Sequence, residues 1–474
     1  MNLLIKGGEV VDGTGDAPKK CDILINSGHI AAIGNLSSYK ADRVIQAMGN
    51  YVLPGFIDIT TAPETHYSLF NEPTQVNSLK QGITTIICGA DGESLAPAMY
   101  PAERLLVNTG WQTMREYFKM MKTVRFGVNL ASFTGYTTAR QSITTKPRNL
   151  GNGEINILFS LLKKCLDDGS VGIAIGKDGL AGLDASQEEI TAVIKLLTAK
   201  TKTALVSLKT EDKLYTLLPE YGIKTIISNL NESLKTRIAF DRFASSLQKI
   251  TPKAEFVFAF SPYPYFQFSA QDILPPSAQK GSLLLNLKKK RISGFFAKKI
   301  KELNLQETFI LNADRKLARI ITGKSVAELA VNREIDGEEA FIRIIETCGE
   351  DTIFISRMKD TKIIEKIATH PKSIVYRSSQ QNTPSLLINS FTESFIEFIR
   401  LSDSLGIRIE MVAKKLSSPA RLFGFKRRGL IKEGFAADIV ILKNNRPEVT
   451  IVNGKIAYEN ASLIEGRYGT IIKT

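Results

Sequence analysis

The sequence has few of the residues from which proteins build zinc centres. It holds three histidines in 474 residues, at His29, His66 and His370. Its four cysteines are far apart and form no Cys-x-x-Cys pair. This spacing excludes both a zinc knuckle and a disulfide framework. Three histidines and four scattered cysteines limit the zinc sites that this chain can build.

Long apolar runs are also missing. No stretch approaches the ~18 apolar residues that a membrane helix needs. Gly7, Gly8 and Glu9 interrupt the N-terminal stretch where a secretory signal would lie. With 43% hydrophobic and 23% charged residues, the composition excludes disordered and collagen-like chains. We therefore expect a cytoplasmic globular protein with no membrane partner.

Lysine and arginine outnumber aspartate and glutamate by 62 to 48, which gives a formal net charge of +14. Such a balance keeps a nucleic-acid-associated protein open as one alternative. The densest basic stretch, at 288–301, is more typical of a helix with a solvated face, because no nucleic-acid module surrounds it. We do not expect nucleic acid to be the partner.

Strand-like apolar runs alternate with helical patterns through the middle of the chain. The runs at 83–88, 128–133, 171–175, 203–208, 225–228 and 373–376 are separated by longer segments with helical periodicity. This alternation predicts parallel βαβ units, and their number favours an α/β fold of the (β/α)8 type, a TIM-type barrel.

Both ends of the chain are rich in short strands. An Asn-Gly pair at 453–454 predicts a hairpin between the last strands. Strands at the two ends most simply pair with each other, since unpaired sheet edges are unfavourable. We therefore predict a discontinuous β-sandwich domain from residues 1–53 and 425–474, around a barrel at 54–424.

Several motifs occur in an order that is specific to one group of enzymes. GEVVDGTG at 8–15, GHIAAIG at 28–34 and PGFID at 54–58 resemble the opening of the amidohydrolase superfamily. Later motifs resemble its N-acyl-D-amino-acid deacylase (D-aminoacylase) branch: QGITT at 81–85, YPY at 263–265, GKSVAELA at 323–330, SPAR at 418–421 and GFAADIV at 434–440. The resemblance also implies a small insertion around 267–345 that covers the barrel mouth.

The resemblance implies a metal-dependent hydrolase of C–N bonds, in which a divalent ion activates water and an aspartate acts as general base. The expected ligands are a His-x-His pair, a cysteine and two further histidines. In this sequence the ligand and base positions carry Thr60, Ala62, Asp91, Ser207, Asn229 and Ser378. A further histidine position, in a Gly-His pair, carries Tyr136.

The loss of every expected metal ligand and of the general base predicts that no catalytic residue remains, and we expect no cofactor. Some polar residues at or near the pocket positions could still bind a ligand: His66, Lys209, Glu211, Tyr263 and Arg377. Arg377 is expected close to the lost metal, where its guanidinium could replace the ion's charge. His29 and His370 are expected outside the pocket, His29 in the β-sandwich and His370 before the last barrel strand.

The favoured interpretation is a metal-free pseudoenzyme with a binding, scaffold or regulatory role. Its ligand would be a small molecule in the former active-site pocket, a partner protein or a second copy of the chain. The alternative is an active hydrolase of non-peptide C–N bonds with a rebuilt zinc site, for which Asp91, His66 and Glu211 are the weak metal candidates.

Overall fold

The structure is a computed structural model. It describes residues 2–474 except 60–67, 99–110, 177–184, 208–213, 231–233, 235, 251–254, 270, 274–289, 313–317, 350–351, 378–392 and 465. No helix in these described parts is both long and apolar enough to cross a membrane.

Parallel strands form the central barrel. Two hydrogen-bonded runs make it up, β6-β7-β8 and β9-β10-β11-β12-β13-β17, and every pairing within them is parallel. β8 and β9 are one strand position, because a single residue, Phe133, separates them. The strands are β6 (Phe56–Asp58), β7 (Ile83–Cys88), β8 (Asn129–Ser132), β9 (Thr134–Gly135), β10 (Gly172–Ile175), β11 (Thr203–Ser207), β12 (Thr225–Ser228), β13 (Phe256–Phe260) and β17 (Ser373–Val375).

One buried cluster fills the inside of the barrel. It takes an apolar residue from each strand position, including Ile57, Ile87, Ala131, Ala174, Leu205, Ile226, Ala259 and Ile374. Because side chains alternate along a strand, the neighbours of these residues point outwards to the surrounding helices. The cluster confirms the predicted (β/α)8 barrel.

Helices surround the barrel strands. In chain order they are α1 (Ser68–Asn71), α2 (Val76–Leu79), α3 (Met114–Val124), α4 (Tyr136–Gln141), α5 (Asn152–Asp167), α6 (Gln187–Lys200), α7 (Leu214–Glu220), α9 (Arg237–Ile250), α15 (Lys362–Thr369), α17 (Ser394–Ser404), α18 (Ile409–Ser417) and α19 (Pro419–Leu422). Several begin at the caps that their sequences predict: Thr113 and Ser186 each accept a hydrogen bond from the backbone three residues later.

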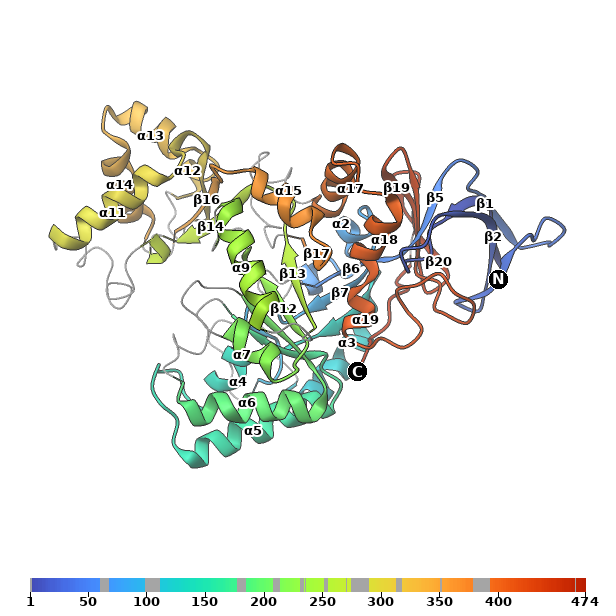
Figure 1. The fold of residues 1–474 in the computed structure, drawn as a ribbon, viewed down its shortest axis with the longest axis horizontal. Helices are drawn as coiled ribbons and strands as arrows, with labels where there is room; N and C mark the ends of the chain where they lie inside the picture. The colour runs from blue at the N-terminus through green and yellow to red at the C-terminus, as the bar shows by residue number, and fades with distance from the viewer. Residues whose placement is uncertain are drawn as a thin grey trace.

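The two ends of the chain share one β-sheet at the right of Figure 1. β18 pairs antiparallel with β5, which joins the strands that follow the barrel to those that precede it. Apolar residues from both ends form one core, which includes Ile5, Ile25, Ile439 and Ile451. The strands are β1 (Leu3–Val10), β2 (Lys19–Asn26), β3 (His29–Gly34), β4 (Arg43–Gln46), β5 (Tyr51–Pro54), β18 (Ile439–Lys443), β19 (Arg446–Val452), β20 (Lys455–Glu459) and β21 (Ser462–Leu463).

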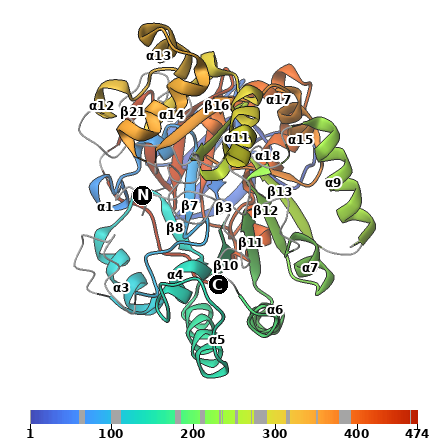
Figure 2. The same cartoon turned by 90° about the vertical axis from the view of Figure 1, so that its left-hand side faces the viewer.

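A separate unit interrupts the barrel between β13 and β17, which pair directly with each other. Figures 1 and 2 place it at the end of the barrel away from the β domain. Its antiparallel sheet has the order β14-β16-β15, with helices packed against it. The elements are β14 (Tyr265–Ser269), α11 (Lys290–Glu302), β15 (Thr308–Asn312), α12 (Ala318–Ile321), α13 (Val326–Arg333), α14 (Gly337–Cys348) and β16 (Ile353–Arg357).

Candidate functional site

Two of the positions singled out from the sequence, Asp91 and Ser207, meet at the carboxyl ends of the barrel strands, together with Ser228. Ser207 ends β11, and its hydroxyl donates to Oδ1 of Asp91 at 2.6 Å. The hydroxyl of Ser228, at the end of β12, lies 3.2 Å from the Ser207 hydroxyl. Both serines are buried, whereas Asp91 is exposed. At this point of the mouth, the accessible Asp91 carboxylate therefore lies beside two buried hydroxyls.

The loop that carries Asp91 is packed tightly onto the neighbouring strand ends. A Cβ on Gly176, just past β10, would lie 2.0 Å from the carbonyl oxygen of Asp91. A Cβ on Gly135 would lie 2.4 Å from the carbonyl oxygen of Gly92. Only glycine allows the two backbones to approach this closely. These two glycines fix the height of the Asp91 loop above the barrel.

Hydrogen bonds hold the same loop from the side. The Ser94 hydroxyl accepts from the backbone N–H of Gly135 at 2.9 Å and donates to the Ala96 carbonyl at 2.6 Å. The Thr138 hydroxyl accepts from the backbone N–H of Ser94 at 3.0 Å. Asp91 itself has a left-handed backbone, with φ of 55°. Ser94 and Thr138 belong to no recognisable sequence motif, because each holds the loop through a backbone group.

Asn229 occupies its predicted position at the mouth, but the preceding residue makes the contact. Its backbone is left-handed, with φ of 60°, and its side chain is half-buried. Ser228, which precedes it, points into the barrel. It lies two residues after the inward-facing Ile226 on β12, and residues two apart on a strand share a face.

Arg377 follows the carboxyl end of β17, and its buried side chain pairs with Asp58, the last residue of β6. Its Nε is 3.3 Å from Oδ2 of Asp58, its backbone N–H donates to Oδ1 at 3.1 Å, and Nη1 donates to the Ser78 hydroxyl at 3.1 Å. Asp58 sits between the inward-facing Ile57 and Ile59, so its carboxylate faces outwards towards α2. Burial lowers the pKa of Arg377, and the Asp58 carboxylate opposes that effect.

Tyr136, at the Gly-His position, is also turned away from the mouth. It begins α4, is fully buried and donates its hydroxyl to Glu189 of α6. The Arg140 guanidinium pairs with the same carboxylate, Nε to Oε1 at 2.8 Å. Burial raises the pKa of Tyr136, and the neighbouring Glu189 charge adds to the effect. The side chain therefore joins a buried structural network between two outer helices.

Tyr263 and the two described histidines lie in other surroundings. Tyr263 is half-buried against the apolar residues Leu311 and Ile355 of the unit between β13 and β17, and burial raises its pKa. His29 is exposed in the β domain, and His370 precedes β17 at the opposite end of the barrel from the mouth. The prediction that neither histidine lies at the mouth is thus in agreement with the structure. Thr60, Ala62, His66, Lys209, Glu211 and Ser378 lie outside the described residues.

Among the described residues, the donors that meet at the mouth do not fit a zinc ion. Zinc sites in proteins take nitrogen and sulfur ligands with at most one or two carboxylates. The donors that meet here are one carboxylate, already accepting from Ser207, and two serine hydroxyls. Among the residues that the structure describes, no group of three or more His, Cys, Asp or Glu side chains is placed to hold a metal.

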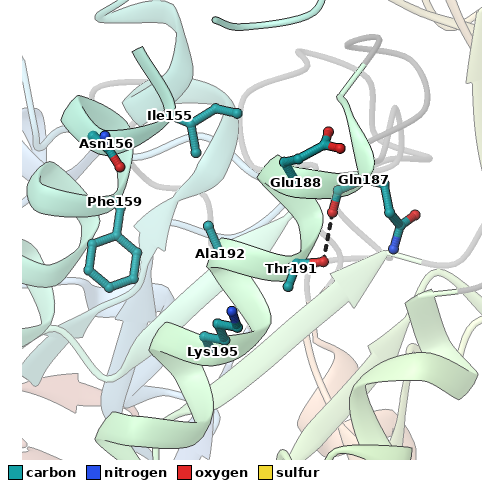
Figure 3. Close-up of a pocket in the computed structure, with 8 residues that line it drawn as sticks. All are labelled: Ile155, Asn156, Phe159, Gln187, Glu188, Thr191, Ala192 and Lys195. Atoms are coloured by element: carbon teal, nitrogen blue, oxygen red, sulfur yellow. Dashed lines mark hydrogen bonds between the residues drawn. The ribbon is translucent and has the colours of Figure 1, made fainter. Parts of the chain in front are cut away.

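A depression of about 430 Å³ lies elsewhere, between α5 and α6 on the outside of the barrel. Figure 3 shows its lining from both helices: Ile155, Asn156, Phe159, Gln187, Glu188, Thr191, Ala192 and Lys195. The one hydrogen bond drawn there runs from Thr191 Oγ1 to the Gln187 carbonyl at 2.7 Å, within a single helix. None of the positions predicted from the sequence contributes to this depression.

Comparison with known proteins gives relatives over nearly the whole chain. N-acyl-D-glutamate deacylase from Alcaligenes xylosoxydans xylosoxydans is 26% identical over 467 residues, which are 93% of this chain and 87% of the relative. N-acyl-D-aspartate deacylase from the same organism is 23% identical over 452 residues, which are 93% of this chain and 85% of the relative. No family model matches the chain.

Solved structures show the same fold. The N-acyl-D-glutamate deacylase of Bordetella bronchiseptica, complexed with zinc and a phosphonate inhibitor, has a TM-score of 0.78 and 21% identity. D-aminoacylase, described as defining a novel subset of amidohydrolases, has a TM-score of 0.78 and 20% identity. Each match covers 100% of this chain and 99% of the other. The chain resembles the N-acyl-D-amino-acid deacylases and has the D-aminoacylase fold, a barrel with a small β domain, as the sequence predicted.

Proposed function

We propose that the protein is a metal-free pseudoenzyme of the N-acyl-D-amino-acid deacylase type, which binds a small molecule at the barrel mouth without hydrolysing it. The observation that carries the proposal is the contact between Asp91 and Ser207, two positions at which the resemblance implies metal ligands. Their side chains meet each other directly, Oγ to Oδ1 at 2.6 Å. A serine hydroxyl is a poor zinc ligand, and the carboxylate it bonds has lost part of its capacity to accept.

The surroundings of Tyr136 and Arg377 support the same proposal. Both stand at or beside positions that the metal chemistry of the relatives would use, and both are engaged in buried contacts that hold the barrel together. The residues at the expected metal-ligand and general-base positions have been replaced, while the glycines that bring the Asp91 loop onto the barrel are present. This combination is typical of a fold that keeps its pocket and has lost its reaction.

A ligand at this mouth would meet donors and acceptors rather than a metal. The Asp91 carboxylate can accept hydrogen bonds from an amine, amide or hydroxyl of the ligand, because the bond from Ser207 uses only part of its capacity to accept. The loop that carries it is held by Ser94 and Thr138, so its position is fixed before binding. Pre-organisation of this kind reduces the entropy lost on binding.

The first experiment compares reaction with binding. The protein, stripped of metal and then supplied with Zn²⁺ or Mn²⁺, is incubated with N-acetyl-D-glutamate, N-acetyl-D-aspartate and N-acetyl-D-leucine. Free amine is measured by a fluorogenic assay. We expect no release above the protein-free control with either ion. Release that requires metal and rises in proportion to protein concentration would contradict the proposal and favour the rebuilt hydrolase.

The second experiment locates the binding site. A panel of N-acyl amino acids, free amino acids and polyols is screened by thermal shift against wild type, Asp91→Asn and Glu188→Gln. Glu188 lines the depression between α5 and α6, so it provides a matched carboxylate-to-amide control away from the mouth. A ligand of the mouth should shift the Tm of wild type and of Glu188→Gln but not that of Asp91→Asn. Loss of the shift only in Glu188→Gln would refute binding at the mouth.

A further inference from the structure

Residues 468–474, here called the floor strap, run beside β8 at the end of the barrel opposite the mouth. The backbone N–H of Gly469 donates to the Phe126 carbonyl at 2.7 Å. The N–H of Leu130 donates to the Thr470 carbonyl at 2.9 Å, and that of Ile472 donates to the Leu130 carbonyl at 2.8 Å. Leu130 and Ile471 form a parallel bridge. The floor strap thus adds a short parallel strand to β8.

The other edge of the floor strap contacts the segment that leads into β10. The backbone N–H of Thr474 donates to the Gly169 carbonyl at 3.3 Å, and its hydroxyl donates to the Ser170 carbonyl at 3.2 Å. Lys202 donates its Nζ to the Thr474 hydroxyl at 2.6 Å. Above this level the third and fourth barrel positions bond directly to each other: the backbone N–H of Val171 donates to the Ser132 carbonyl at 3.0 Å, and Thr134 of β9 pairs with Ile173 of β10. Figure 2 shows this end of the chain next to β10.

Ile472 carries the floor strap into the barrel core. Its side chain is 8% exposed and belongs to the same buried cluster as the inward-facing residues of the barrel strands. Gly469 makes the close approach to β8 possible, since a Cβ there would lie 1.8 Å from the Val128 carbonyl oxygen. The floor strap therefore fills the gap between the third and fourth barrel positions and contributes an apolar side chain to the interior.

A buried amide connects the floor strap to the β domain. Oδ1 of Asn129, on β8, accepts from the backbone N–H and the hydroxyl of Thr470, each at 3.0 Å, and from Nδ2 of Asn453 at 2.8 Å. Its Nδ2 donates to Oδ2 of Asp438 at 3.1 Å. Arg428 pairs with Asp438 and donates to Asn453 Oδ1 at 2.8 Å. One fully buried side chain thus meets the barrel, the floor strap and two strand ends of the β domain.

We infer that the floor strap is a latch between the two parts of the molecule. When docked, it closes the seam between β8 and β10 and locks the β domain onto the barrel through Asn129. When released, it opens that seam and frees the bonding groups of Asn129, while the barrel strands above stay paired through their own ladders. Its release is therefore a local opening of the fold and not an unfolding of the barrel.

The test uses hydrogen exchange followed by mass spectrometry on Gly469→Ala and on a control, Gly153→Ala. The control is a glycine of α5 at which an added Cβ meets nothing within 4 Å. We expect Gly469→Ala to raise exchange at least about tenfold at residues 126–132, 169–172 and 468–474, which corresponds to a latch weakened by about 1.4 kcal/mol or more. Exchange in α13 and α14 should stay as in wild type. The control should exchange as wild type throughout.

Two results would overturn the inference. Unchanged exchange at residues 126–132 in Gly469→Ala would mean that the floor strap does not close this seam. Faster exchange everywhere would mean that the floor strap is an inseparable part of the core. A second measurement covers poor folding of the variant: a chain ended at Arg467 is melted with and without a synthetic peptide of residues 466–474. The latch predicts that the peptide raises its Tm, and no rise at any peptide concentration would contradict it.

Discussion

Replacing Arg377 should destabilise the barrel strongly, because its charge neutralises a carboxylate that has no access to water. Arg377 is 1% exposed and Asp58 is 0% exposed. Removal of one partner from a buried ion pair leaves the other charge uncompensated, which costs about 3–5 kcal/mol. We therefore expect Arg377→Met to lose about that much of its free energy of unfolding. Methionine keeps most of the side-chain volume, so the loss reports the charge rather than a cavity.

The double variant separates the charge effect from a general loss of packing. Asp58→Asn keeps an oxygen that can accept from the backbone N–H of Arg377, now held at 3.1 Å by Oδ1. Combined with Arg377→Met, it removes both charges at once, and the double variant should be more stable than Arg377→Met alone by about 2 kcal/mol or more. A matched exposed pair on α14 is the control: Arg343→Met, which breaks the contact with Glu339, should stay within about 0.5 kcal/mol of wild type.

Urea unfolding supplies the assay, with fluorescence of the single tryptophan as the probe. Trp111 is 4% exposed and donates Nε1 to the Leu95 carbonyl at 2.8 Å, so its emission reports on the barrel. Far-UV circular dichroism provides a second probe. An Arg377→Met variant as stable as the exposed control, or a double variant whose loss equals the sum of the single losses, would refute the reasoning.

Two further predictions concern buried polar groups. Burial and the nearby Lys415 charge lower the pKa of His370 to about 4, so the folded state keeps this ring neutral while the unfolded state, with a pKa of about 6.5, binds a proton first. The free energy of unfolding of wild type should therefore fall by at most about 3 kcal/mol between pH 6.5 and pH 4, and by less than this because solvent screens the half-buried ring. His370→Gln should lack this component. Equal slopes of stability against pH in both proteins would count against the prediction. Tyr136→Phe leaves Glu189 with the Arg140 pair alone and should destabilise the protein by about 1–2 kcal/mol in urea unfolding, without changing the thermal shift given by a ligand of the mouth; a lost ligand shift would mean that Tyr136 contacts the ligand.

The fold was largely predictable from the sequence, because the signals involved are local and repeated. Strand-like runs alternating with helical patterns indicate parallel units, and the Asn453-Gly454 turn indicates the hairpin between β19 and β20. The pairing of β5 with β18 followed from the need to cover sheet edges at both ends of the chain. Each of these inferences rests on a pattern of several residues, so an error at one position does not change it.

The site was less predictable, because it depends on which way single side chains point. Arg377 follows the inward-facing Ile374 and Tyr376 in alternation and so faces away from the barrel interior, and a shift of one residue would have turned it inwards. The hydroxyl that contacts Ser207 belongs to Ser228, which the sequence did not single out, and not to its neighbour Asn229. The floor strap left no motif at all, since its contacts to β8 are backbone hydrogen bonds that many sequences could form.

The most direct test of the central claim is the metal content of protein purified without an affinity tag, measured by elemental mass spectrometry. A mouth that presents Asp91 and two serine hydroxyls should retain well below one equivalent of zinc, manganese or iron. A near-stoichiometric amount of any of these metals, lost together with stability when a chelator is added, would contradict the account and restore the hydrolase.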